Sequence, residues 1–156
     1  MPLAIGTPAP AFALPSKPGT VVDLSTSIGR EKLVILFFPL AFSSVCTAEM
    51  CQFRDDWSRW EQLGCRVIGV SVDSPFVTEK FREELGLPFP ILSDFNKTAS
   101  DAYGVLDPDL LGLKGVSKRA AFVVGSDGRI AYAWVADVPS IQVEFESIRA
   151  AVERAG

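Results

Sequence analysis

Residues 33–51 read LVILFFPLAFSSVCTAEMC, and the first six of them form one continuous apolar run. A run of this kind, with β-branched and aromatic side chains, predicts a strand that is buried on both faces of a sheet. We expect the strand to end at Pro39, because proline has no amide hydrogen to donate to a neighbouring strand. Apolar side chains then recur every three or four residues across 44–63, which predicts a long amphipathic helix.

The remaining sequence continues this alternation of strands and helices. RVIGVSV (66–72) predicts a second buried strand, and residues 75–85 predict a helix whose first turn contains Pro75, with Asp73 or Ser74 as its cap. Further elements are expected in this order: a short FPIL segment (89–92), a helical patch (98–103), two strands (120–125 and 129–135) joined by a turn at 126–128, and a terminal helix (141–155).

This order predicts an α/β fold with a central mixed β-sheet flanked by helices. With 156 residues, of which 48% are hydrophobic and 22% charged, the chain fits a single folded domain over 1–156. The formal net charge of −4 argues against an extended basic surface, so we expect no nucleic-acid partner. The first residues resemble neither a secretory signal nor a membrane span, so we expect no membrane partner and a cytoplasmic location.

Cys46 is the strongest candidate for a chemically active residue. The chain has three cysteines and no histidine, which excludes the Cys-His and Ser-His catalytic pairs. Cys46 falls in the first turn of the helix predicted over 44–63, where unpaired amides and the positive end of the helix dipole favour a thiolate. Without histidine or a Gly-rich phosphate loop, we expect neither a metal nor another cofactor.

The motif around Cys46 resembles that of the peroxiredoxins, in which Pro, three residues, Thr or Ser, and two residues precede the peroxidatic cysteine. These positions are Pro39, Ser43 and Cys46 here. The resemblance implies that the Ser43 hydroxyl hydrogen-bonds the thiolate and the peroxide, and that Pro39 shields the thiolate from water. Serine in place of the commoner threonine is an accepted variant.

The family also places an arginine at the start of a late strand, which indicates Arg119 here. Lys114 and Lys118 lie nearby, although only an arginine has the forked donors that hold two oxygens at once. Glu49 matches a carboxylate that orients this arginine in the family. It could equally be an ordinary acid favoured by the helix dipole in the first turns.

The resemblance extends over most of the chain, through IGTPAPAFAL (5–14), GVSVDSP (69–75) and FPILSD (89–94). It implies a thioredoxin-like fold, and LAF (40–42) is most similar to the one-Cys and bacterioferritin-comigratory branch. The implied activity is reduction of hydrogen peroxide and organic hydroperoxides, with a sulfenic acid on Cys46 as the intermediate. A homodimer would be consistent with the family.

Cys51 lies where one branch of the family keeps its resolving cysteine, although it could also serve only in packing. Resolution would give an intramolecular disulfide, which a thioredoxin- or glutaredoxin-like dithiol protein would reduce. On an intact helix five residues turn by about 500° and rise about 7.5 Å, so the disulfide requires the helix to unwind. We assign no role to Cys65, and we expect Trp57 and Trp60 to pack in the core.

Two other functions fit parts of the sequence. A thioredoxin-like disulfide reductase normally uses two cysteines separated by two residues, whereas four residues separate Cys46 from Cys51. A non-catalytic redox sensor or interaction module would use oxidation of Cys46 to change a binding surface without turnover. Steady-state consumption of peroxide with a dithiol reductant distinguishes a sensor from an enzyme.

Overall fold

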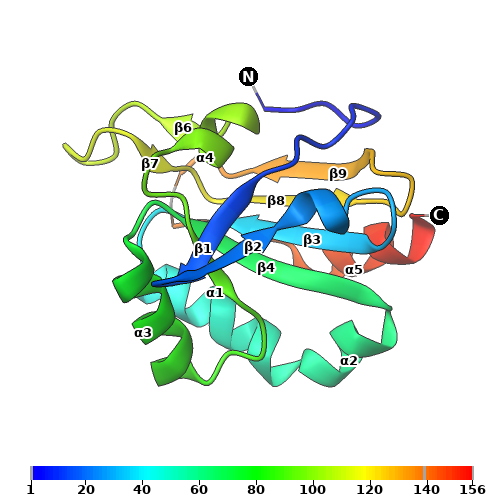
Figure 1. Ribbon diagram of the computed structural model, residues 1–156, viewed down its shortest axis with the longest axis horizontal. Coiled ribbons are helices and arrows are strands. Elements are labelled where there is room, and N and C mark those ends of the chain that lie inside the picture. Colours follow the sequence, from blue (N-terminus) through cyan, green and yellow to red (C-terminus); the bar gives the residue numbers. More distant parts are fainter. Residues whose placement is uncertain (1, 139, 156) are drawn as a thin grey trace.

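A five-stranded mixed sheet with the strand order β5-β4-β3-β8-β9 forms the centre of the computed structural model (Figure 1). The structure describes residues 2–138 and 140–155. The five strands are β3 (Lys32–Phe37), β4 (Cys65–Ser71), β5 (Ile91–Ser93), β8 (Ala120–Val124) and β9 (Ile130–Val135). Strands β3, β4 and β5 are parallel, and β8 and β9 are added antiparallel on the other side of β3. This arrangement matches the predicted mixed sheet.

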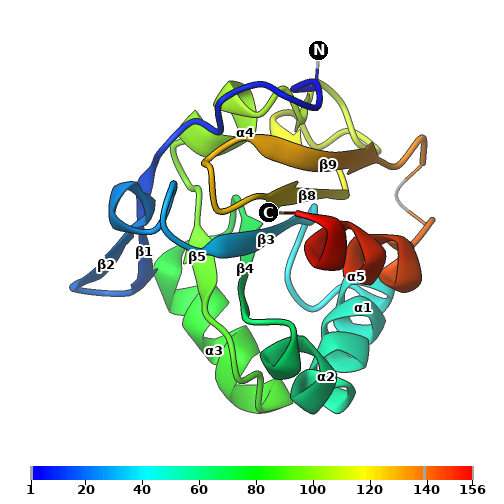
Figure 2. The ribbon, with the colours of Figure 1, turned by 90° about the vertical axis from the view of Figure 1, so that its right-hand side faces the viewer.

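Helices and a hairpin cover the two faces of this sheet (Figure 2). One face packs against four helices: α1 (Ser44–Asp55), α2 (Trp57–Gln62), α3 (Pro75–Leu85) and α5 (Phe145–Arg154). The other face packs against the hairpin of β1 (Ala13–Lys17) and β2 (Thr20–Asp23), the 3-10 turn η1 (Leu24–Thr26) and α4 (Thr98–Ala102). Two short strands, β6 (Leu106–Asp107) and β7 (Val116–Ser117), pair separately.

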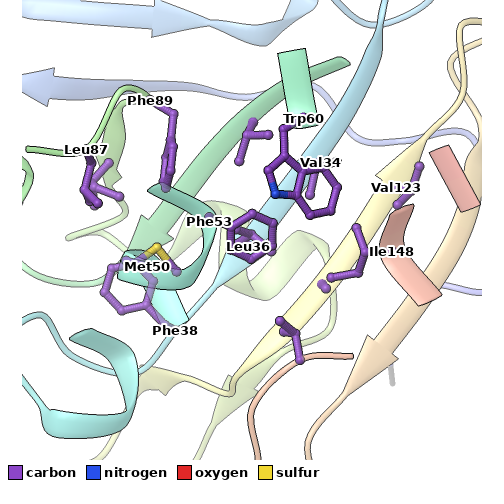
Figure 3. Packing of buried hydrophobic residues seen from close by; sticks show 14 of the residues in the cluster. Val34, Leu36, Phe38, Met50, Phe53, Trp60, Leu87, Phe89, Val123 and Ile148 are labelled. Atoms are coloured by element: carbon purple, nitrogen blue, oxygen red, sulfur yellow. The ribbon is translucent and has the colours of Figure 1, made fainter. Parts of the chain in front are cut away.

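The side chains of β3 alternate between two buried layers, which explains why its sequence is apolar without interruption. Val34 and Leu36 belong to the layer under α1 and α5, whereas Leu33 and Ile35 belong to the layer under the hairpin. All four are fully buried. Figure 3 shows the first layer, in which the aromatic rings of α1 and α2 pack against the sheet. The expectation that both tryptophans of the 44–63 segment pack on the core is confirmed.

The single helix predicted over 44–63 is wrong in one respect, because two helices meet at Asp56. At that residue ψ is 18°, outside the helical region, and the Asp56 carboxylate accepts a hydrogen bond of 3.1 Å from the Gln52 side chain. The turn brings the ring of Trp60 to 4.8 Å from that of Phe53, centre to centre. Core packing therefore breaks a helix that local periodicity alone would continue.

The terminal helix also begins later than predicted, at Phe145 instead of 141. Glu144 has an extended backbone (φ −92°, ψ 95°), and the Val143 amide donates to the Glu49 carboxylate at 3.3 Å. This contact ties residue 143 to α1, and the extended backbone of Glu144 places the start of the helix at Phe145. The hairpin β1–β2 was not predicted, since its half-exposed strands lack a sustained apolar pattern.

Among the described residues, the structure contains no helix with the length and apolar character needed to cross a bilayer.

Candidate active site

Cys46 lies in the first turn of α1, as the sequence predicts. Ser43 is the N-cap of this helix and has an extended backbone (φ −71°, ψ 151°), so Cys46 is the third helical residue. The first amides of a helix have no carbonyl partners within it, and their dipoles favour negative charge nearby. The Cys46 side chain is fully buried in the layer between α1 and the sheet. Burial excludes water and strengthens each electrostatic contact that the sulfur makes.

The register of the sheet brings Arg119 to this sulfur. Phe37, the last residue of β3, pairs with Ala120, the first residue of β8. The chain entering α1 and the residue preceding β8 therefore lie at the same edge of the sheet, although 73 residues separate them. The Arg119 Nη2 atom donates to Cys46 Sγ at 3.0 Å, and both side chains are buried.

Neither lysine near Arg119 takes this position. Lys114 is exposed, and the half-buried Lys118 lines a hollow on the other side of Pro39 and Arg119 that does not include Cys46. Of Lys114, Lys118 and Arg119, only Arg119 contacts Cys46. An arginine in this position brings a fixed charge and several donors to the Cys46 sulfur.

Glu49 lies one turn after Cys46 and faces the same arginine. Its Oε1 atom is 3.5 Å from Arg119 Nη1 and accepts the Val143 amide at 3.3 Å. Burial raises the pKa of Glu49 to about 7, and this rise is partly offset by Arg119 and by the Val143 amide. The Oε2 atom has no hydrogen-bond partner among the described residues. Glu49 is therefore buried beside Arg119 and is not an exposed acid at the helix start.

Pro39 and Ser43 line an open hollow of about 300 Å³ that reaches Arg119. Pro39 is buried, whereas Ser43 is exposed. The Ser43 hydroxyl donates to the Leu40 carbonyl at 3.0 Å and does not donate to Cys46 in this structure. The predicted Ser43–thiolate hydrogen bond is not formed in this structure, in which the N-cap hydroxyl turns back toward its own loop.

The opposite wall of the hollow consists of leucines that the sequence analysis does not identify. Leu110, Leu111 and Leu113 come from the connection between β6 and β7. Leu111 is 94% exposed. Leu110, Leu111 and Leu113 together form an apolar edge of the hollow. Only the fold shows that this connection lies opposite the start of α1.

The two other cysteines differ in their surroundings. All three are free thiols, and Cys51 lies half-buried farther along α1. Cys65, the first residue of β4, has its Sγ atom 3.7 Å from the Trp60 carbonyl oxygen. Burial raises the pKa of the Cys65 thiol to about 11, which makes it a poor nucleophile near neutral pH. Within residues 2–138 and 140–155, no three potential metal ligands converge.

Comparisons with known proteins place the chain among a family of similar sequences. Residues 5–133 match the AhpC/TSA family. The chain is 34% identical over 147 residues to a Coxiella burnetii protein that carries the name peroxiredoxin bcp, covering 92% of this chain and 93% of that protein. It is 36% identical over 159 residues to Peroxiredoxin-2 of Rattus norvegicus, covering 93% of this chain and 76% of that protein.

Solved structures are also similar. The crystal structure of the peroxidoxin BcpB from Mycobacterium tuberculosis has a TM-score of 0.84 and 27% sequence identity, covering 96% of each chain. Together with the mixed sheet and its flanking helices, this similarity confirms the predicted thioredoxin-like fold.

Proposed function

The chain belongs to the AhpC/TSA family and is a thiol-dependent peroxidase of the bcp-like branch, and from this premise we propose that Cys46 is the residue that attacks the peroxide. The observation that carries the proposal is the 3.0 Å contact between Arg119 Nη2 and Cys46 Sγ at the start of α1. A buried guanidinium stabilises a thiolate and the negative charge that develops on a reacting oxygen.

The proposed step is a displacement at the peroxide oxygen–oxygen bond. The Cys46 thiolate attacks the terminal oxygen, which bears the hydrogen, so that a sulfur–oxygen bond forms while the oxygen–oxygen bond breaks. Cys46 becomes a sulfenic acid, and the departing oxygen leaves as hydroxide or alkoxide and takes a proton from solvent. Sulfur is oxidised and the peroxide is reduced.

The other residues have supporting roles in this proposal. Arg119 orients the peroxide, Glu49 holds the guanidinium at 3.5 Å, and Pro39 keeps water from the sulfur. Ser43 lines the hollow, and its hydroxyl oxygen is proposed as an acceptor for the peroxide hydrogen, because its own hydrogen is donated to Leu40. Both hydrogen peroxide and organic hydroperoxides fit a hollow of about 300 Å³.

We propose that Cys51 resolves the sulfenic acid. Its thiolate attacks the oxidised sulfur, so that a disulfide forms and the sulfenic oxygen leaves as water after protonation. A thioredoxin- or glutaredoxin-like dithiol protein then reduces the disulfide by exchange, which the reducing cytoplasm supports. We further propose that residues 1–156 act as one catalytic domain and that two copies form a homodimer; light scattering tests the dimer.

The decisive experiment replaces the sulfur of Cys46. Cys46→Ser keeps nearly the same volume but is barely ionised at neutral pH, so peroxide consumption with a dithiol reductant should fall to the uncatalysed rate. Cys65→Ser is the matched control and should keep wild-type turnover. Retained turnover in Cys46→Ser would overturn the assignment of the peroxidatic cysteine.

A further inference from the structure

Asp73 connects the end of β4 to the loop that carries the chain into α1. Its Oδ2 atom accepts the amide of Ala41 at 2.8 Å and the hydroxyl of Ser71 at 2.7 Å. The Asp73 carbonyl oxygen accepts the Ser93 hydroxyl at 2.6 Å. Ser71 and Ser93 are buried at the ends of two paired parallel strands. Asp73 is therefore held by the sheet and in turn holds residue 41.

The loop that it holds is conformationally strained. Phe42 has a φ of 69°, in the left-handed region that a bulky aromatic residue rarely adopts. Its ring is 49% exposed and packs edge-on against Phe81 of α3, with 5.2 Å between ring centres. A strained conformation persists only where surrounding contacts hold it in place. The Asp73–Ala41 hydrogen bond and the Phe42–Phe81 contact hold the loop from outside, beside the Ser43–Leu40 hydrogen bond within it.

Catalysis as proposed above makes opposite demands on this loop. Attack on the peroxide needs Cys46 buried beside Arg119. The loop before α1 meets this need in the conformation seen in the structure, which we call the closed state. Condensation with Cys51 needs the first turns of α1 to unwind, because two cysteines five residues apart on a helix cannot join. The Asp73–Ala41 hydrogen bond, which keeps the loop closed, therefore favours attack on the peroxide and opposes condensation with Cys51.

We propose that Asp73 is a positioning residue that acts as a latch, and that its hydrogen bond to the Ala41 amide sets the balance between the closed and unwound states of the loop and first turn of α1. This inference rests on the proposed function for its kinetic consequences. The structural consequence of the inference, local opening of residues 41–47 in the reduced protein, is independent of the proposed function.

Asp73→Ala should separate the two chemical steps. Loss of the latch leaves Cys46 beside Arg119 for a smaller fraction of the time, so the rate constant for oxidation of Cys46 by peroxide should fall about twofold as the unwound fraction rises from about one twentieth to about one half. The rate constant for disulfide formation should rise about tenfold, because the unwound state is about tenfold more populated. A residue that only stabilises the fold would not raise one rate constant while lowering the other.

Three variants make the test decisive. Asp73→Ala removes the acceptor, and Asp73→Asn keeps a neutral acceptor of the same shape, so its effects should have the same sign and smaller size. Asp101→Asn makes the same chemical change at an exposed position on α4 and should behave as the wild type. If Asp73→Ala fails to fold, Asp73→Asn alone still carries the prediction.

Amide hydrogen exchange on the reduced proteins gives a readout that is independent of peroxidase activity. Exchange within residues 41–47 should be at least about tenfold faster in Asp73→Ala, with strands β3 and β8 unchanged. Unchanged exchange at 41–47 overturns the latch. Faster exchange in a protein whose wild type shows no oxidation of Cys46 instead overturns the proposed function and leaves the latch in place.

Discussion

Cys46, Arg119 and Glu49 form the chemical centre at the scale of single residues, and each depends on burial. The guanidinium lies between a sulfur at 3.0 Å and a carboxyl oxygen at 3.5 Å, with all three side chains shielded from water. In such surroundings a charge interacts more strongly than at the surface, and the direction of each donor matters.

Arg119→Lys should therefore slow oxidation of Cys46 although it conserves the charge. The lysine ammonium lacks the planar fork that contacts the sulfur and the carboxyl group together, so the rate constant should fall by roughly 10- to 100-fold. Stopped-flow fluorescence from the three tryptophans can follow the oxidation. The exposed Arg30 gives the control Arg30→Lys, and equal rates in the two variants would remove Arg119 from the proposed mechanism.

Glu49 should give the protein a pH-dependent stability near neutrality. Its pKa is about 7 in the folded protein, against an ordinary value of 4.5, chiefly because of burial. The folded state thus holds more protons than the unfolded state between these values, and the free energy of unfolding falls as pH rises through about 7. The stabilisation is fully present only below about pH 4.5 and amounts to on the order of 3 kcal/mol.

Glu49→Gln should flatten this dependence, because glutamine can accept the Val143 amide without titrating. Urea unfolding at several pH values from 5 to 8 measures the slope in both proteins, with the exposed Glu31→Gln as control. Parallel slopes for Glu49→Gln and the wild type would show that the carboxyl group does not titrate in this interval.

At the scale of elements, α1 combines two functions that conflict. Its intact first turn presents Cys46 to Arg119, whereas Cys51 lies five residues along the same helix. A helix end is the part of a helix that opens most readily, so unwinding from Ser44 onward is the physically least costly route to a disulfide. The break at Asp56 shortens α1 and confines this opening to one short helix.

One equivalent of peroxide should therefore produce a Cys46–Cys51 crosslink within a single chain, which peptide mapping detects. In Cys51→Ser, the sulfenic acid on Cys46 should persist and react with a sulfenic-acid probe. Cys65→Ser should crosslink as the wild type does. A crosslink between chains, or a persistent sulfenic acid in the wild type, would leave Cys51 as a packing residue and make an external thiol the resolving group.

At the scale of the whole molecule, the hollow in front of Arg119 is formed by segments far apart in sequence. The start of α1 supplies one wall, and the β6–β7 connection supplies the leucine wall. Figure 1 shows this connection extending from the body of the molecule beside β7. An apolar wall at the entrance to a peroxide site favours substrates with an alkyl chain, since burying each methylene contributes about 0.8 kcal/mol.

Leu111→Ser should therefore lower kcat/KM for a long-chain alkyl hydroperoxide by about fourfold to fifteenfold, the effect of burying one or two fewer methylenes. The value for hydrogen peroxide should stay unchanged, because this substrate has no chain to contact the wall. Val21→Ser, an equally apolar exposed position on β2, is the control. An equal loss with both peroxides would show that Leu111 supports the fold of the connection and not substrate choice.

Local sequence patterns determined the buried strands, the strand–helix alternation and the position of Cys46, because these depend on periodicity and on residues adjacent in the chain. They also supplied Arg119 and Glu49, although only through resemblance to a family. The tertiary structure decided what depends on distant partners. The Phe37–Ala120 register selects Arg119 over the neighbouring lysines, the helix breaks at Asp56, and the buried Glu49 carboxyl group accepts the Val143 amide ahead of α5. Each of these features depends on side chains that meet only when the chain folds, so only the folded arrangement reveals them.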